Sequence, residues 1–283
     1  MMSQHLTPLV IGLVLGAALL HAAWNAILRS GADRLWSIVV VTMTSASVAL
    51  PFVFILPLPA QASWPYVGVS AVLEIVYCLL LARAYRDGDL AQVYPMARGT
   101  APALVTLGAA AVAGEQLSAA ALLGVALVSL GIMALALGGA RPSGKSTAAA
   151  IATGVFIAAY TVTDGLGARL SGHAMSYAAW LFVLQGAPMP LIYLMLRGPL
   201  AISVRDPETR KAVLGGVLSM LAYGVVLWAL TLSPMGQVSA LRETSILFAA
   251  VIGVVFLGER ASLKRLAAAA MIAAGAFLLS VAR

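Results

Sequence analysis

The chain consists almost entirely of apolar runs that are long enough to cross a membrane. About 20 apolar residues are needed to span a hydrocarbon core of roughly 30 Å. Ten such runs lie near residues 7–28, 35–56, 65–85, 92–112, 119–138, 148–168, 175–196, 212–232, 237–257 and 263–281. Each run is predicted to be a helix, because lipid cannot satisfy free backbone groups and the alternating pattern of a barrel strand is absent.

The composition excludes a soluble protein. Hydrophobic residues make up 62% of the 283 residues and charged residues 10%, and the mean hydropathy is +1.00. The predicted fold class is therefore an all-α integral membrane protein with ten transmembrane helices. Little sequence remains outside the runs, and neither a metal-ligand cluster nor a Ser/His/Asp constellation is present. We therefore expect no enzyme, no cofactor and no metal site.

Three features invite other interpretations. Residues 139–146 match the P-loop pattern, but hydrophobic runs flank them where a strand and a helix of a βαβ unit are required. We read residues 140–147 as a linker instead. No Lys or Arg precedes the first run, which argues against a signal peptide. The single cysteine, Cys78, lies in the third run and is predicted to pack there.

The basic residues predict an orientation. Thirteen of the 17 Lys and Arg residues fall in the odd-numbered connections between runs, and two fall on the other face. The thirteen are Arg29, Arg34, Arg83, Arg86, Arg141, Lys145, Arg197, Arg205, Arg210, Lys211, Arg260, Lys264 and Arg265. By the positive-inside rule these connections are cytoplasmic and both termini lie outside. Topology thus explains the net charge of +7 without a nucleic-acid partner. The expected location is the cell (inner) membrane, with lipid and a small-molecule substrate as partners, as a monomer or homodimer.

Two arginines within the runs indicate an internal repeat. Arg98 precedes a Gly-Glu pair at 114–115, and Arg242 precedes one at 258–259, at a constant offset of 144. The expected units are a first repeat over residues 1–139, a linker over 140–147 and a second repeat over 148–283. Because each unit has five spans, the second must enter the membrane from the opposite side. Such inverted repeats place a transporter's site near the bilayer midplane.

These motifs resemble those of a known family. The fourth run carries Arg98-Gly-Thr-Ala-Pro102 and ends in Gly114-Glu115, and its partner from Ser245 to Glu259 lacks the proline. Together with the ten runs, this is similar to an EamA-type carrier of the drug/metabolite transporter superfamily, over essentially the whole length. The segment from Leu20 to Arg29 further resembles a subgroup associated with phosphonate-utilisation genes. Members usually keep both termini in the cytoplasm, which is opposite to the orientation that the charges predict.

The arginines are the first candidates for a substrate site. A central arginine costs roughly 2.5–3.5 kcal/mol on insertion scales, so it marks function by default. Arg98 lies about 9 Å from the cytoplasmic side and Arg242 equally deep from the outside, so their heights should differ by roughly 12 Å. One arginine would then serve each access state. Alternatively both are structural ion pairs, Arg98 with Glu74 and Arg242 with another acid. Adjacency alone does not pair Arg242 with Glu243, because neighbours on a helix point about 100° apart.

Other polar residues are expected around the arginines. Glu74, at the centre of the third run, either couples protons, meets the substrate or neutralises Arg98, since burial favours a neutral carboxyl group. His21, Trp24 and Asn25 share one helix face, which should line the cavity, and His21 is a second proton-coupling candidate. Further wall candidates, each with packing as the alternative, are Tyr77, Tyr94, Tyr160, Thr163, Tyr223 and Trp228. Asp164 is expected near the outer end of the sixth run, in contact with water.

These residues predict a secondary carrier of a small anionic or zwitterionic metabolite. The arginines would bind a carboxylate, phosphate or phosphonate group, and Glu74 or Glu243 an ammonium group. A carrier of organic cations is the alternative, with Glu74 and aromatic rings holding an amine. A membrane protein that transports nothing is a third class.

Overall fold

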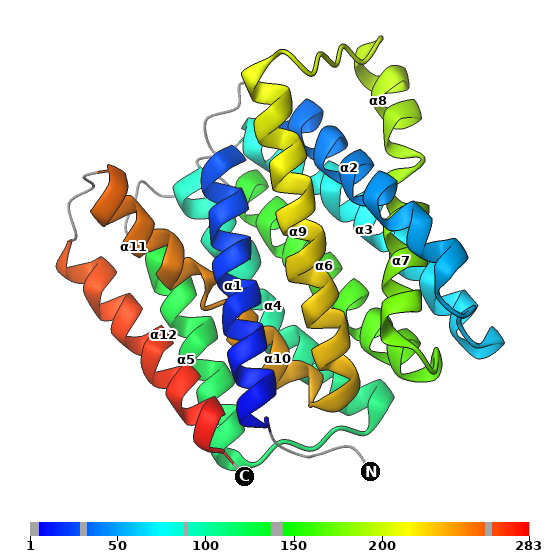
Figure 1. Cartoon of the computed structure of the whole chain (residues 1–283). Coiled ribbons are helices and arrows are strands. Elements are labelled where there is room, and N and C mark those ends of the chain that lie inside the picture. The colour runs from blue at the N-terminus through cyan, green and yellow to red at the C-terminus, as the bar shows by residue number, and fades with distance from the viewer. Residues whose placement is uncertain (1–5, 29–32, 88–89, 137–143, 258–261, 283) are drawn as a thin grey trace.

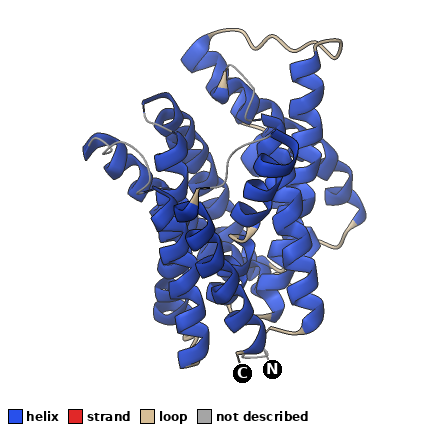
Figure 2. Ribbon diagram, turned by 90° about the vertical axis from the view of Figure 1, so that its left-hand side faces the viewer, coloured by secondary structure: helices blue, strands red, loops and turns tan. Residues whose placement is uncertain are grey.

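The chain folds into a bundle of membrane-length helices (Figures 1 and 2). The computed structural model describes residues 6–28, 33–87, 90–136, 144–257 and 262–282, which contain no strand. The helices are α1 (Pro8–Leu28), α2 (Arg34–Ile55), η1 (Gln61–Ser63), α3 (Trp64–Asp87), α4 (Leu90–Ala113), α5 (Ala119–Ala136), α6 (Gly144–Leu170), α7 (Ala174–Gly186), α8 (Met189–Arg197), α9 (Pro207–Leu232), α10 (Met235–Arg242), α11 (Ser245–Leu257) and α12 (Leu263–Val281). Nine stretches of the described chain are long and apolar enough to cross a membrane. The α10–α11 pair makes the tenth crossing, so the predicted fold class is confirmed.

Two runs that were expected as single helices are broken. In the seventh run α7 ends at Gly186 and α8 begins at Met189, with Pro188 between them. Proline lacks the N–H that a helix interior needs, so it separates the two segments. The ninth run breaks after Arg242 without any proline, and α11 starts at Ser245. This second break coincides with a buried cluster of charged side chains, described below.

The two halves pack with inverted symmetry. α1 packs on α9 as α6 packs on α3, and α1 meets α10 and α11 as α6 meets α4. In two further contacts each helix packs on its own symmetry equivalent, α2 on α7 and α5 on α12. In Figure 1, α1 begins and α12 ends at the end of the molecule opposite the α8–α9 connection. This is the arrangement of two five-helix units related by a twofold axis in the membrane plane.

Small residues bring α5 and α12 into close contact. A Cβ atom added to Gly275 would come within 2.7 Å of the Gly124 carbonyl oxygen, and one added to Gly131 within 2.8 Å of the Ile272 side chain. Small residues at such interfaces let helix backbones approach in lipid, where no hydrophobic effect drives association. The α5–α12 pair is therefore a packed support at one side of the bundle.

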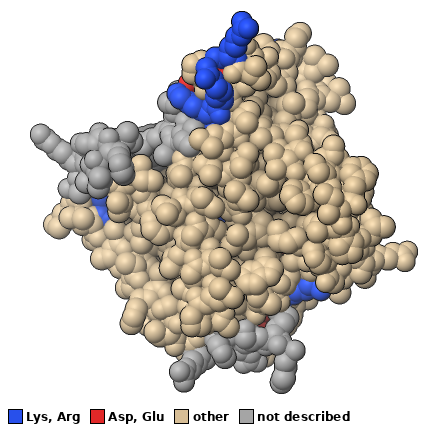
Figure 3. Space-filling model, viewed as in Figure 1, with Lys and Arg blue, Asp and Glu red and all other residues tan. Residues whose placement is uncertain are grey.

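The surface shows where the membrane lies. Figure 3 shows a wide band without Lys or Arg, and a basic cluster at the α8–α9 end. That cluster includes the exposed residues Arg205, Arg210 and Lys211. Large apolar side chains such as Phe54 and Leu107 are exposed on the flanks, where lipid would cover them. This exposed basic cluster thus lies at one end of the bundle, and apolar side chains cover its flanks.

Parts of the sequence predictions fall at the edges of the described chain. α6 begins at Gly144, so residues 144–147 of the predicted linker form a helical turn, and so do the last three letters of the P-loop-like segment. Residues 140–143 of that linker and the second Gly-Glu pair, at 258–259, lie outside the described residues.

Candidate functional site

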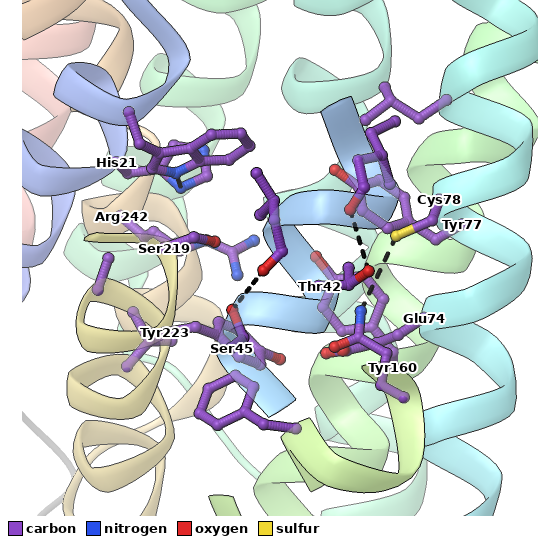
Figure 4. A pocket seen from close by; sticks show the side chains of 18 of the residues that line it. His21, Thr42, Ser45, Glu74, Tyr77, Cys78, Tyr160, Ser219, Tyr223 and Arg242 are labelled. Atoms are coloured by element: carbon purple, nitrogen blue, oxygen red, sulfur yellow. Dashed lines mark hydrogen bonds between the residues drawn. The ribbon is translucent and has the colours of Figure 1, made fainter. Parts of the chain in front are cut away.

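A cavity of about 110 Å³ lies between the two halves of the bundle (Figure 4). Its wall is formed by side chains from eight helices, namely α1, α2, α3, α4, α6, α7, α9 and α10. Glu74 on α3 and Ser219, near its symmetry-related position on α9, both face it, as do His21 on α1 and Tyr160 on α6. The cavity therefore lies on the axis that relates the repeats.

Two arginines meet at one carboxylate beside this cavity. Arg98 Nη1 donates to Glu243 Oε1 at 3.1 Å, and Arg242 donates to the same oxygen from Nε at 3.3 Å and Nη2 at 3.1 Å. All three side chains are at most 5% exposed. The predicted height difference of roughly 12 Å is therefore wrong. The helix ends at Arg242 instead of continuing, and the long side chains from α4 and α10 converge on one oxygen.

The observed ion pairs also differ from the expected ones. Arg98 pairs with Glu243 and not with Glu74. Arg242 does pair with its sequence neighbour Glu243, since Glu243 caps α10 in a turn and is not held at the 100° offset of a continuous helix. One acid thus neutralises one of two arginines, and the three side chains together carry a formal charge of +1.

His21 and Trp24 extend this cluster. His21 Nε2 lies 2.6 Å from Arg98 Nη2, and Trp24 Nε1 donates to His21 Nδ1 at 3.2 Å. A neutral imidazole has only one acceptor nitrogen, so in either tautomer only one of these two donors finds an acceptor. Tyr94 places its ring 5.4 Å from the Arg98 guanidinium carbon, and Asn25 turns back to its own helix, donating to the His21 carbonyl oxygen at 2.8 Å. Donors outnumber acceptors on this side of the cavity.

The opposite side is acidic and aromatic. Glu74 enters the cavity across from Arg242 (Figure 4) and is 5% exposed. Within the described residues its carboxylate makes no hydrogen bond or ion pair. Three tyrosines form a continuous wall, with ring centroids 5.5 Å apart for Tyr77–Tyr160 and 6.0 Å apart for Tyr160–Tyr223. The cavity therefore has a cationic side and an anionic side.

Asp164 lies behind this aromatic wall. Its side chain is fully buried, and it accepts hydrogen bonds from Tyr177 at 3.0 Å and from Tyr223 at 2.5 Å. The expectation that water solvates Asp164 is wrong, because α7 and α9 cover this part of α6. Through Tyr223, a buried carboxylate fixes one side of the cavity wall.

Four residues predicted for the wall do not line the cavity, and two of them, Asn25 and Tyr94, lie beside His21 and Arg98. The other two lie elsewhere. Thr163 lines a separate groove with Tyr66 between α3, α4 and α6, and its hydroxyl donates to the Ala159 carbonyl oxygen at 2.8 Å. Trp228 packs against the main apolar core. Neither side chain is among those that line the central cavity.

Residues of α2 and α7 complete the cavity and were missed in the sequence. Thr42 and Ser45 face it from α2, and Gln185 faces it from α7. Cys78, expected to pack, lines it as well, and its sulfur accepts from Gln185 Nε2 at 3.9 Å. A signal was present, since Thr42 and Ser45 have helical i, i+3 spacing and Gln185 is a lone amide in an apolar run. Among the described residues no cluster of three His, Cys, Asp or Glu side chains could hold a metal ion.

The Gly-Glu pair of the first repeat does not contact the cavity. Gly114 ends α4 with φ of 65°, and Glu115 then binds Arg169 Nη2 through Oε1 at 2.6 Å. Its other oxygen accepts the backbone N–H of Met235 at 2.8 Å, at the first turn of α10. A carboxylate at a helix N-terminus satisfies free N–H groups and complements the helix dipole. Glu115 therefore links the ends of α4, α6 and α10.

A buried cavity of mixed charge between two inverted halves of a helical membrane bundle is the architecture of a transporter. Residues 145–281, which run from α6 to α12, match the EamA-like transporter family. This match supports the resemblance to an EamA-type carrier of the drug/metabolite transporter superfamily that the motifs predicted. The likeness to the phosphonate-associated subgroup stays a prediction.

Solved structures share the fold. Chains from such structures match this protein in 29 cases. One is a crystal structure described only as that of a protein, with 18% sequence identity, 96% of each chain covered and a TM-score of 0.77. No curated protein matches the chain. At this identity the likeness concerns the fold alone.

Proposed function

We propose that the protein is a secondary active transporter of small zwitterionic or anionic metabolites, of the amino acid, phosphonate or organophosphate type, which works by alternating access. The observation that carries the proposal is the meeting of Arg98 and Arg242 beside a cavity whose other side holds Glu74. Guanidinium groups bind carboxylate, phosphate and phosphonate oxygens through charge-assisted hydrogen bonds. An ammonium group on the same molecule would then face Glu74 and the tyrosine rings.

The size of the cavity supports a substrate of few atoms. Pockets for drug-sized ligands measure about 300–1,000 Å³, whereas this cavity has about 110 Å³. Transport would be proton-coupled through Glu74 or His21. Both line the cavity, and a buried carboxyl without a partner favours its neutral form.

A carrier of organic amines is the second candidate. It is favoured by Glu74, whose carboxylate has no partner in the described part of the chain while Glu243 already binds both arginines. In that case an ammonium group would bind Glu74 within the tyrosine wall, and the arginines would be structural.

A matched set of six small probes separates these functions. Glycine and aminomethylphosphonate are zwitterions, acetate and methylphosphonate are anions, and methylammonium and tetramethylammonium are cations. Ligand binding to the folded protein raises thermal stability by mass action. We expect both zwitterions and methylphosphonate to stabilise the purified protein, and Arg98→Gln to weaken this binding at least tenfold. Arg210→Gln, which removes an exposed arginine at the α8–α9 end, should bind as the wild type does.

Transport itself is measured by counterflow of labelled glycine in liposomes. Arg98-dependent binding with counterflow supports the proposal. If only the two cations stabilise the protein, and Arg98→Gln responds as well as the wild type, the protein is an amine carrier. Binding without counterflow would assign the protein to a class that does not transport.

A further inference from the structure

Glu243 occupies the position that a substrate anion would take. Its Oε1 accepts all three bonds that Glu243 receives from the two arginines, while Oε2 is buried and has no hydrogen-bond partner among the described residues. An arginine that binds a carboxylate commonly uses both oxygens in parallel bonds. Here one oxygen is shared and the other is left unsatisfied, which is costly in a buried site. The arrangement therefore neutralises one of the two positive charges and leaves several guanidinium N–H donors without a well-placed acceptor.

The acid belongs to one repeat only. The residue equivalent to Glu243 in the first repeat is Gly99, at the same offset of 144 that relates Arg242 to Arg98. A side chain at Gly99 would force Met133 to move, since a Cβ atom there would lie 2.8 Å from the Met133 side chain. The repeats therefore supply two arginines but a single acid between them.

Glu243 also lies at a break in its helix. It caps α10, and the backbone resumes as α11 at Ser245. Thr244 donates its hydroxyl to the Leu241 carbonyl oxygen at 2.7 Å, which satisfies a group that a continuous helix would have bonded. The backbone of Glu243 stays bonded across the break, with its N–H donating to the Ala240 carbonyl oxygen at 3.2 Å and its own carbonyl oxygen accepting from the Ile246 N–H at 3.1 Å. Release of the arginines therefore requires movement of the Glu243 side chain alone.

We infer that Glu243 is a resident carboxylate that holds the anion site between substrates and gives it up when a substrate anion binds. This rests on the proposed function and concerns how the same site is controlled. Two buried arginines without a counter-charge are strongly unfavourable. Glu243 therefore lowers the charge of the empty site from +2 to +1. The carrier can then switch its access from one side of the membrane to the other without substrate. A substrate must offer more than Glu243 does, namely two or three oxygens aimed at both guanidinium groups.

Glu243→Gln makes two opposed changes measurable. Without its internal competitor the anion site should bind methylphosphonate about tenfold more tightly, as expected if Glu243 leaves only about a tenth of the molecules competent to bind. Exchange of glycine in counterflow should persist, because a bound substrate then occupies the arginine site each time the carrier changes its access. Net uptake into empty liposomes should fall at least tenfold, because the empty return step leaves both arginines uncompensated.

Glu208→Gln is the matched control. It neutralises another cation-paired acid, bound to Lys211 on the exposed surface at the start of α9 and away from the cavity. We expect it to alter exchange and net uptake in equal proportion and to leave the affinity for methylphosphonate unchanged. Weaker binding of methylphosphonate to Glu243→Gln, or equal loss of exchange and net uptake, would overturn the inference and indicate a structural ion pair.

A second comparison covers the case in which Glu243→Gln does not fold. Arg242→Gln/Glu243→Gln keeps the local charge of +1 and leaves Arg98 free, whereas Arg242→Gln keeps Glu243 on Arg98. The double variant should bind methylphosphonate about tenfold more tightly than Arg242→Gln, and equal affinities would refute the resident carboxylate.

If none of the six probes binds the wild type, the proposed function fails first. If they bind through Arg98 but removal of Glu243 tightens nothing, this inference alone fails.

Discussion

Among the described residues, four carboxylates lie within the bundle, and their partners distinguish them. Glu115 binds Arg169 and a helix N-terminus, Asp164 binds two tyrosines, and Glu243 binds two arginines. Glu74 has no such partner in the described chain, although it is 5% exposed. A buried acid without a partner is retained at a stability cost, which favours a role in binding. At the scale of single residues, Glu74 is the acid with the strongest case for contacting a substrate.

Glu74 should therefore determine the preference for zwitterions. Acetate and glycine share a carboxylate and differ by an ammonium group, so the ratio of their dissociation constants isolates that group. We expect Glu74→Gln to reduce the preference for glycine at least tenfold, as measured by titration of the purified protein. The affinity for acetate should change little.

The control for this comparison is Glu208→Gln, which removes an exposed acid paired with Lys211 and should leave the ratio as in the wild type. An unchanged ratio in Glu74→Gln would assign the ammonium group to Glu243 instead. Loss of methylammonium binding in Glu74→Gln, together with normal methylammonium binding in Arg98→Gln, would favour the amine carrier.

Helix ends and breaks determine where the charges meet. α4 continues through Arg98 although it contains Pro95 and Pro102, whereas α10 stops at Arg242. The end of α4 is set by Gly114, whose φ of 65° is a conformation that glycine adopts readily and other residues avoid. That turn directs Glu115 toward the first turn of α10. The geometry of one helix end is thus connected to the position of the arginine-bearing segment.

Gly114→Ala should destabilise the protein by about 1 kcal/mol, because a left-handed backbone strains any residue with a Cβ atom. The measurement is the free energy of unfolding in detergent, or the shift in melting temperature. A matched control is Gly68→Ala on α3, where an added Cβ meets no atom within 4 Å. That change should be neutral or stabilising, since alanine favours a helix interior more than glycine does. Equal effects of the two substitutions would contradict the assigned role of Gly114.

The whole molecule has one axis of symmetry and an unequal distribution of charge. Because of the inverted packing, α1 begins and α12 ends at the same end of the bundle (Figure 1). The exposed basic residues of the α8–α9 connection lie at the opposite end (Figure 3). By the positive-inside rule that end is expected to face the cytoplasm, although members of the family usually keep their termini inside.

Labelling of single cysteines tests the orientation. Ser203→Cys lies in the exposed α8–α9 connection, and Ala60→Cys lies at the other end, where the backbone N–H of Ala60 binds the Ser171 carbonyl oxygen. In intact cells, a membrane-impermeant maleimide should label Ala60→Cys and should label Ser203→Cys only after permeabilisation. The wild type is the control, since its single cysteine, Cys78, is buried. The reverse pattern would place both termini in the cytoplasm.

Much of the architecture could be predicted because it depends on local composition. The number of membrane crossings follows from the length of apolar runs, and the paired arginines at 98 and 242 reveal the repeat. His21, Glu74 and the three tyrosines of the wall do meet in one cavity. Thr163 and Trp228 do not, because sharing a helix face with a predicted site residue does not show which neighbouring helix that face meets.

The sequence by itself determined the fold class and its symmetry, since every backbone group in lipid must be satisfied within a helix and each five-span unit inverts the next. Only the tertiary structure decided which charges meet. Arg98 and Glu243 are 145 positions apart in sequence and 3.1 Å apart in space. Their contact depends on the break after α10 and on the approach of helices from both repeats. Neither feature is encoded by a local pattern, because both arise from packing between segments that are distant along the chain.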